Sequence, residues 1–262
     1  EKAFEQYLKY LTKVGALFFR KQSETYELAA ATGEDVYELV DRYVSDPSLH
    51  PDDLLAAFCE EAGAAKDGEF LEAKQYNMYF NEDKRFKIRF ARANDLGDTL
   101  WDELKADRDS NASKPARSYE GDVVYVLCED EAEIQVAKNA VKGITDSRIA
   151  VAVPNAPVPF VDTLLKVKAC KHYLPPNEAE KISAQTETRL RDILEDPEDG
   201  FLPSLRNTYR TIVGGDSSCW YGEAGKVIVD QPKQPHKPAD AICEERYTKH
   251  CRIKHPDLNF AH

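Results

Sequence analysis

The sequence has no long apolar run, since no stretch approaches the roughly 20 residues that a membrane-spanning helix needs. Its opening residues, EKAFEQYLKY, lack the pattern of a secretory signal peptide. The 262 residues begin with glutamate and contain a single methionine, Met78. These features predict a cytoplasmic chain that does not enter a membrane, and we interpret it as a piece of a longer polypeptide.

Basic residues are too few to make the chain positive, because 35 Lys and Arg face 47 Asp and Glu and the net charge is −12. This balance argues against broad, non-specific adhesion to nucleic acid or anionic lipid, although it is compatible with a local basic face. With 42% apolar and 31% charged residues, the composition also excludes a collagen-like chain and an intrinsically disordered acidic chain. The length allows one large domain or several small ones.

Paired cysteine motifs are absent, since none of the six cysteines belongs to a C-x-x-C sequence. In a cytoplasmic chain we expect them to be reduced thiols. The best metal candidate is the C-terminal group of Cys243, His250, Cys251 and His255. Zinc ligands normally come in pairs about two to four residues apart, followed by a longer gap, and this group does not follow that spacing. We therefore favour ordinary histidines and thiols, and predict no metal and no cofactor.

Catalytic motifs are also missing from the sequence. There is no G-x-x-x-x-G-K-[ST] loop, no G-x-G-x-x-G, no G-x-S-x-G and no H-E-x-x-H. The nearest approach to a phosphate-binding loop is GEAGK at residues 222–226, which has the wrong spacing and is followed by valine. We predict no catalytic residue and a non-enzymatic role.

The N-terminal residues have a helical stripe followed by two short β-rich runs. Apolar side chains recur at positions 4, 7, 8, 11 and 14, which predicts a helix with one apolar face. Residues 16–19 and 25–28 predict the two strands of a hairpin. A helix followed by a hairpin is typical of the second half of a winged helix, so we predict a winged-helix-like segment over residues 1–46 and a mixed helix and strand region over 47–104.

Residues 84–92 alternate between apolar and basic side chains, which predicts a strand with one buried face. The basic positions are Arg85, Lys87 and Arg89. One interpretation is the solvated side of an antiparallel strand, and the other is a stripe that contacts phosphates. These three residues are therefore the predicted nucleic-acid contacts if DNA is a partner.

The polar, proline-containing residues 105–119 predict a linker, and the pattern changes after them. Residues 122–127 and 148–154 are apolar runs that flank a helical segment at 129–141, which predicts a parallel pair of strands buried on both faces. We predict a Rossmann-like βαβ unit with added helices over residues 120–229. Within this range, residues 219–221 and 226–229 predict the two strands of a hairpin around Gly222. Residues 230–262 predict a proline-rich spacer and a C-terminal tail, with the extended spacer over 230–240 and a short helix near 241–250. The expected fold class is therefore mixed α+β and α/β.

An enzyme remains an alternative if a ligand binds at the carboxyl ends of these two strands, where ligands of open α/β sheets gather. The polar or strand-ending residues there are Glu129, Asp130, Pro154 and Asn155. They include no nucleophile with a neighbouring base, so this alternative ranks last.

Four segments in a fixed order carry a resemblance: LTKVGALFFRKQSETYEL, DVVYVLCEDEAEIQVAKNAV, RIAVAVPNAPVPFVDTLLKVKACKHYL and the aromatic CWYG. Together they resemble the region downstream of the ATPase module in the large P-loop ATPases of prokaryotic phage-defence (BREX) systems, the group that includes BrxC and PglY. The resemblance implies a non-catalytic scaffold or interaction region of a larger ATPase that acts against foreign DNA. Other subunits or domains of a defence complex would be its partners.

The catalytic residues of that family, the P-loop and its acidic partner, match nothing in this sequence, so no active-site residue is carried over. The alternative function is a DNA-binding module that uses the wing at residues 16–28 and the basic face of the strand at 84–92. We expect such a module to bind duplex DNA in a salt-sensitive way.

Overall fold

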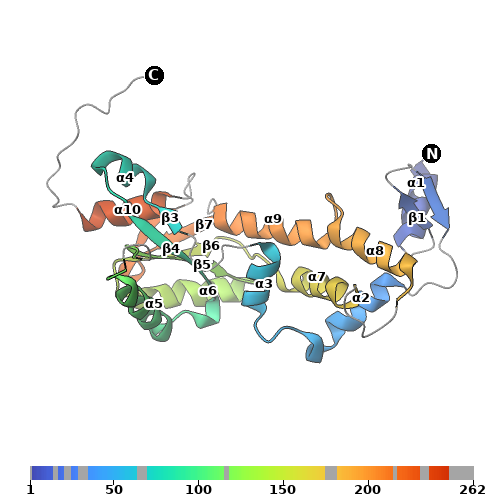
Figure 1. Cartoon of the computed structure of the whole chain (residues 1–262), viewed down its shortest axis with the longest axis horizontal. Helices are drawn as coiled ribbons and strands as arrows, with labels where there is room; N and C mark the ends of the chain where they lie inside the picture. Colours follow the sequence, from blue (N-terminus) through green and yellow to red (C-terminus); the bar gives the residue numbers. More distant parts are fainter. Residues whose placement is uncertain are drawn as a thin grey trace, which may run out of the picture. The chain divides into compact units, whose positions relative to one another are not determined.

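A six-stranded mixed sheet and ten α-helices make up most of the regular structure of the described residues (Figure 1). The computed structural model describes residues 2–13, 17–20, 25–28, 35–63, 70–114, 118–174, 182–214, 217–230 and 236–247. Contacts divide the chain into two compact units, Glu1–His50 with Leu165–Pro203 and Pro51–Leu164 with Ser204–His262. Among the described helices, none combines the length and the apolar character that crossing a membrane requires.

The sheet belongs to the second unit, and its three central strands run parallel to one another. The outer strands pair antiparallel to their neighbours. In spatial order the strands are β3 (Phe70–Glu72), β4 (Arg85–Arg92), β5 (Gly121–Leu127), β6 (Ile149–Pro154), β7 (Ser218–Tyr221) and β8 (Val227–Asp230). Every residue of β5 and β6 is buried, which confirms the predicted parallel pair covered on both faces.

One face of the sheet is covered by α5 (Asp98–Asn111) and α6 (Glu131–Ala140). The apolar side chains between these helices and the strands form one continuous cluster. Its larger members are Leu96, Trp101, Leu104, Val124, Val126, Ile134, Val141, Ile144, Ile149, Val151 and Val153. Because α6 connects β5 to β6, the burial of this cluster holds the predicted strand–helix–strand unit together.

Aromatic rings line the opposite face of the sheet. The ring centres of Phe90 and Tyr125 are 5.7 Å apart and stacked, and Tyr125 meets Trp220 edge to face at 5.3 Å. Tyr209 of α9 (Phe201–Gly214) lies 5.8 Å from Phe90. This packing explains why the apolar positions of residues 84–92 alternate, since Phe90 points to the aromatic face and its neighbours point to α5.

The first unit contains the N-terminal helix and hairpin. The hairpin strands pair antiparallel, with Leu17 opposite Leu28. The unit's helices and strands are α1 (Lys2–Lys13), β1 (Leu17–Arg20), β2 (Thr25–Leu28), α2 (Val36–Ser45), α8 (Ala184–Glu195) and most of α7 (Val161–Tyr173). The predicted order of a helix followed by a hairpin is therefore present.

Short polar side chains fix where several helices begin. Each carries an oxygen that accepts a hydrogen bond from a backbone N–H of the first turn, which satisfies a donor that has no partner inside the helix. These residues are Asp35 for α2, Asp53 for α3 (Leu54–Ala62), Asp130 for α6 and Ser183 for α8.

The first half of the predicted linker, residues 105–119, is helical and not a linker. Residues 105–111 complete α5, and Leu104 and Arg108, one turn apart, are both buried. The strands on either side of the segment pair in parallel, from Phe86 opposite Gly121 to Arg92 opposite Leu127. The polar composition is misleading here because Arg108 is buried against a carboxylate that follows in the sequence.

The short helix predicted near residues 241–250 is present as α10 (Lys237–Arg246). It begins inside the predicted extended spacer, with Pro238 in its first turn. Asp240 of this helix is 4% exposed, and its Oδ1 accepts a hydrogen bond from the backbone N–H of Tyr76 at 3.0 Å. Tyr76 lies in the first turn of α4 (Lys74–Phe80), whose own N-cap residue, Ala73, offers no side-chain oxygen. Asp240 therefore caps α4 from a distance of 164 residues in sequence.

Candidate functional site

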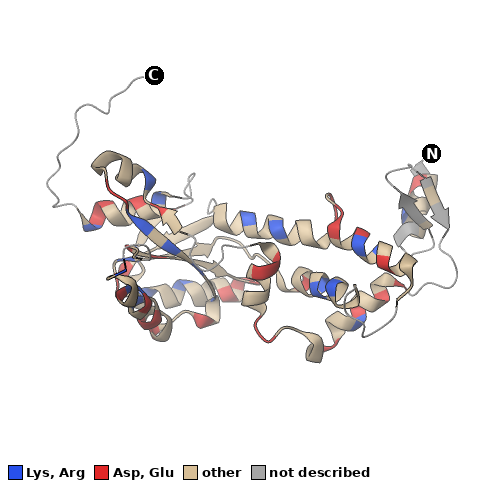
Figure 2. Cartoon of the chain, in the orientation of Figure 1, with Lys and Arg blue, Asp and Glu red and all other residues tan. Residues whose placement is uncertain are grey.

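Four basic and three acidic side chains form a connected network on the face of the sheet that α5 covers. Figure 2 shows the blue positions of β4 and the red positions of α5 from which several of them come. The members are Lys87, Arg89, Arg108, Arg148, Asp107, Asp122 and Asp146. With four positive groups against three negative ones, the network carries a net positive charge inside an acidic protein.

Asp122, the second residue of β5, lies at the centre of this network. It is fully buried, and its Oδ2 is 2.7 Å from Nη1 of Arg108, which is itself 3% exposed. Its Oδ1 is 3.4 Å from Nε of Arg89. Burial raises the pKa of Asp122 to about 6, because the attraction of Arg108 and Arg89 offsets only part of the desolvation.

Asp107 of α5 forms a second centre, nearer to solvent. Its Oδ2 accepts hydrogen bonds from Lys87 Nζ at 3.0 Å, from the Tyr119 hydroxyl at 2.8 Å and from Arg89. Burial alone would raise the pKa of Asp107, but the hydrogen bonds from Tyr119, Lys87 and Arg89 outweigh it and lower this pKa to about 2. Asp107 is therefore charged at neutral pH and balances the basic face of β4.

The three predicted nucleic-acid contacts all have partners within the protein. Lys87 and Arg89 meet Asp107, so their face of β4 is covered by α5 and is not the open, solvated side of a strand. Arg85 donates from Nε to the carbonyl oxygen of Ser118 at 2.9 Å, and its guanidinium lies 4.5 Å from the ring centre of Phe70. Asp107 offsets part of the charge of Lys87 and Arg89, and contact of the three residues with nucleic acid stays a prediction.

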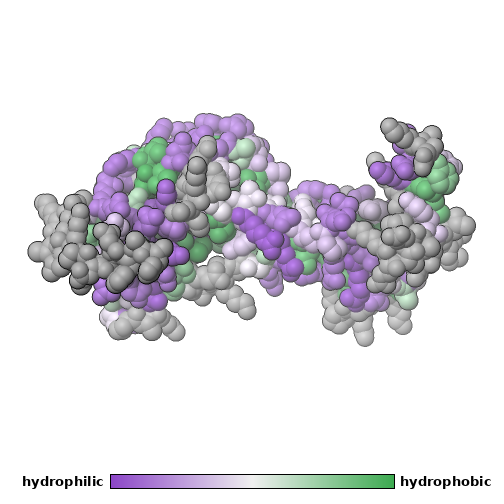
Figure 3. Space-filling model, turned by 90° about the horizontal axis from the view of Figure 1, so that it is seen from above, coloured by the Kyte–Doolittle hydropathy of each residue, from purple (hydrophilic) through white to green (hydrophobic). Residues whose placement is uncertain are grey.

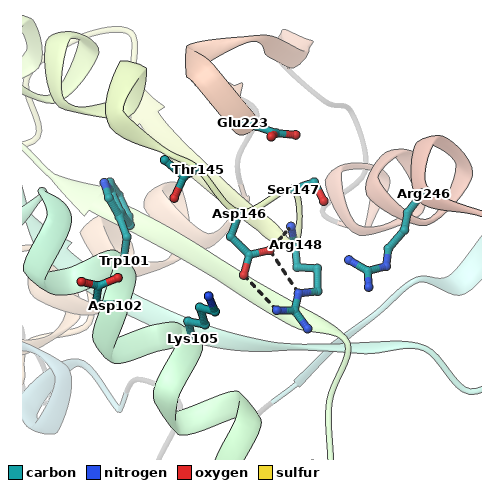
Figure 4. Close-up of a pocket in the computed structure, with 9 residues that line it drawn as sticks. All are labelled: Trp101, Asp102, Lys105, Thr145, Asp146, Ser147, Arg148, Glu223 and Arg246. Atoms are coloured by element: carbon teal, nitrogen blue, oxygen red, sulfur yellow. Dashed lines mark hydrogen bonds and ion pairs between the residues drawn. The ribbon is translucent and has the colours of Figure 1, made fainter.

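A cavity of about 350 Å³ lies beside the network, within the second unit (Figure 4). Its walls come from α5, from the turn before β6, from the short 3₁₀ turn Glu223–Gly225 and from the end of α10. The residues that line it are Trp101, Asp102, Lys105, Thr145, Asp146, Ser147, Arg148, Glu223 and Arg246. The cavity and the network share Asp146 and Arg148.

Asp146 uses both of its oxygens to hold arginines. Oδ1 accepts from the backbone N–H of Arg148 at 2.9 Å and from its Nε at 3.1 Å. Oδ2 accepts from Arg148 Nη2 at 3.1 Å and from Arg108. Since a carboxylate has about four lone-pair positions, Asp146 has no acceptor left for a ligand. Its role is to orient Arg148 at the wall of the cavity.

The carboxyl ends of β5 and β6, where an enzyme site was the last-ranked alternative, are occupied by structural hydrogen bonds. Glu129 Oε1 accepts from the backbone N–H groups of Phe160 and Val161 at 2.9 and 3.1 Å, at the start of α7. Asp130 caps α6. The backbone N–H of Asn155 donates to Ser217 at 2.8 Å, and Pro154 pairs with Ser218.

Of the C-terminal metal candidates, only Cys243 lies within the described residues, and His250, Cys251 and His255 lie outside them. Cys243 is buried in α10, and burial raises the pKa of its thiol to about 12. Among the residues that the structure describes, no group of three or more His, Cys, Asp or Glu could hold a metal ion. The described cysteines are free thiols, and Cys128 is fully buried, as expected of a small apolar side chain.

Sequence reasoning missed the centre of the network for two identifiable reasons. Asp122 is the first residue of an apolar run, so the sequence pattern is typical of the polar, solvent-exposed end of a strand. Arg108 lies in a polar segment, where a buried side chain is not expected. The spacing of Trp101, Leu104 and Arg108 is a signal that could have extended the helix, since steps of three and four residues fall on one face.

Comparisons with known proteins do not place the chain in a family. No family model matches it, and neither the curated proteins nor the solved structures include a match.

Proposed function

We propose that this chain is a non-catalytic interaction region and that the aromatic face of α1 contacts a protein partner. The observation that carries the proposal is the exposure of Phe4, Tyr7 and Tyr10, which are 64%, 58% and 58% exposed. Figure 3 shows green, hydrophobic atoms at the surface in the part of the chain that Figure 1 labels α1. The green atoms do not include the tyrosines, because tyrosine lies on the hydrophilic side of this scale.

The three aromatic residues lie three residues apart and follow one side of the helix. Aromatic side chains of about 150–250 Å² each, at these exposures, leave on the order of 300 Å² of ring surface in water. An apolar patch of that size is comparable to the largest patch of a typical monomer, and such patches are often functional. Tyrosine is also enriched at protein interfaces because it buries a large area with little loss of side-chain freedom.

The proposal includes a winged-helix-like part and a Rossmann-like part of the fold. A helix followed by a hairpin, α1 with β1 and β2, is consistent with a winged-helix-like module that contacts a protein. The unit formed by β5, α6 and β6 is consistent with a Rossmann-like scaffold, in which Glu129 and Asp130 serve the scaffold itself. On the resemblance described above, the chain would act in the cytoplasm as part of a larger ATPase in defence against foreign DNA.

Charge favours a protein partner over DNA. The net charge of −12 opposes general attraction to phosphates, and Lys87 and Arg89 are already paired with Asp107. We therefore rank the DNA-binding module second. Duplex DNA binding at low salt that is lost in the Arg85→Glu and Arg89→Glu variants would reverse this order.

The test of the interaction is a double substitution, Tyr7→Ser with Tyr10→Ser, in the protein produced in its natural host. We expect it to abolish co-purification of the partner subunit, because most of the aromatic surface is lost. The matched control is Val136→Ser on α6, which changes a residue 42% exposed outside this face and should leave co-purification unchanged.

A separate assay tests the non-catalytic part of the proposal. The purified chain should not hydrolyse ATP above the rate in buffer. Hydrolysis at an enzyme-like rate, on the order of 1 s⁻¹ or faster, would contradict it.

A further inference from the structure

Three cationic side chains line the cavity beside the ion network, against three carboxylates, one of which is already paired with arginines of the protein. Asp146, the most buried carboxylate in its wall, is fully occupied by Arg108 and Arg148. Its two bonds to the Arg148 guanidinium use Nε and Nη2, so Nη1 has no partner among the described residues. The network therefore presents an arginine whose orientation is fixed in advance, with one face of its donors unused.

Two further cations reach the same cavity from other elements. Lys105 of α5 lines it and makes no hydrogen bond or ion pair with any described residue. Arg246, at the end of α10, meets Glu120 through Nε at 3.4 Å, and its guanidinium lies 5.8 Å from the ring centre of Tyr247. In the described part of the chain, no carboxylate pairs with its two terminal nitrogens. Thr145 and Ser147 add two exposed hydroxyl groups from the turn before β6.

Figure 4 shows how these groups are distributed. Lys105, Arg148 and Arg246 lie in a row across the lower half of the view. Asp102 lies next to Lys105 at one end of this row, and Glu223 lies on the opposite side. The two carboxylates are exposed, so water screens their charge. The side formed by the three cations is therefore suited to a compact group whose oxygens only accept hydrogen bonds.

We propose that this cavity binds a phosphoryl group, either as free phosphate or on a small ester, through Lys105, Arg148 and Arg246. Arginine matches the geometry of phosphate oxygens with paired N–H donors, and lysine adds a compact positive charge. The hydroxyl groups of Thr145 and Ser147 supply neutral donors to the remaining oxygens. A volume of about 350 Å³ falls at the lower end of the range for small-molecule pockets.

The test is isothermal titration calorimetry of the purified chain with inorganic phosphate and, separately, with ribose 5-phosphate. We expect saturable binding of at least one probe at one site per chain. Lys105→Ala and Arg246→Ala should each weaken it at least tenfold, which corresponds to about 1.4 kcal/mol. The matched control is Lys114→Ala, which removes the same charge from an exposed position that does not line the cavity and should change the affinity less than twofold.

Substitution of the two exposed carboxylates, Asp102 and Glu223, tests whether the ligand is an anion. Asp102→Asn and Glu223→Gln should both tighten the binding of phosphate, because each removes a like charge; weaker binding in both would contradict an anionic ligand. Tighter binding of ribose 5-phosphate than of inorganic phosphate would identify an ester as the ligand, and the reverse would identify free phosphate. The proposal is overturned if neither probe binds at millimolar concentration, or if the Lys105→Ala, Arg246→Ala double variant binds as tightly as the unchanged chain. The unfolding temperature of each variant confirms that it folds.

Discussion

Replacing Arg108 by methionine removes the main partner of a fully buried carboxylate while keeping a long side chain in the same space. Arg108 is 3% exposed and Asp122 is fully buried, with 2.7 Å between Nη1 and Oδ2. Removing one partner of a buried ion pair usually costs about 3–5 kcal/mol, because the other charge is left without compensation. Arg89 still lies 3.4 Å from the opposite oxygen of Asp122, so we expect a cost near the lower limit, about 3 kcal/mol.

The cost should depend on pH in a defined direction. The pKa of Asp122 is raised by burial from an ordinary value of 3.8 to about 6, so this carboxyl group favours folding at low pH and loses that contribution as the pH rises through 6. Without Arg108 the folded-state pKa rises further, because an attractive charge has been removed. The Arg108→Met variant should therefore lose more stability at pH 8 than at pH 5, where Asp122 is largely protonated.

The assay is urea unfolding followed by tryptophan fluorescence at pH 5 and pH 8. The chain has two tryptophans, Trp101 and Trp220, and both are buried in the second unit, so the signal reports on the part that contains the network. The matched control is Lys226→Met, which breaks an ion pair with Glu245 at a side chain 63% exposed and should cost less than about 1 kcal/mol. An Arg108→Met cost below about 1 kcal/mol at pH 8, or an equal cost at both pH values, would refute the reasoning.

Two other predictions concern the same part of the fold. Gly121→Ala would place a Cβ 2.1 Å from the backbone oxygen of Arg148. We expect this clash to lower the free energy of unfolding, measured in urea, by at least about 2 kcal/mol. The control is Gly214→Ala, which has open space around the added Cβ and should change that free energy by less than about 0.5 kcal/mol. Asp107→Asn should make the stability of the fold less sensitive to acid. Because the pKa of Asp107 is lowered to about 2, its contribution to the free energy of unfolding is present above pH 4 and is lost as the pH falls towards 2. The difference in free energy of unfolding between the variant and the unchanged chain should therefore shrink over that range.

Local patterns were sufficient to predict most of the sheet. The apolar runs of β5 and β6 predict strands buried on both faces, and the structure confirms them as a parallel pair. The hairpin expected around Gly222 is present as β7 and β8. In each case the structure is determined by burial and turn formation, and the types of neighbouring residues in the sequence indicate both.

Features that depend on distant partners could not be predicted in this way. Arg108 is helical and buried because Asp122 and Asp146 neutralise it, and nothing next to Arg108 in the sequence indicates those partners. Asp240 likewise stabilises α10 and α4 together, although 164 residues separate it from Tyr76. Polar composition alone therefore predicts a linker or spacer when the residues that pair with the polar side chains lie far away in the sequence.

The candidate cavity was also beyond prediction from the sequence, because its cations come from three separate elements. Lys105 and Arg148 lie 43 residues apart, and Arg246 lies another 98 residues further on, as their numbers give by subtraction. Each alone is an ordinary basic residue. Their shared site exists only because α5, the turn before β6 and the end of α10 meet around one cavity.

The most direct test of the proposed interaction region is photo-crosslinking from the aromatic face of α1. The protein would carry benzoylphenylalanine at position 7 or, as the control, at position 136, and would be irradiated in its natural host. The account predicts a defined protein–protein crosslink from position 7 that the control does not give, with a partner subunit or another domain of the same assembly identified by mass spectrometry. A crosslink to nucleic acid, the same product from both positions, or no product from position 7 would contradict it.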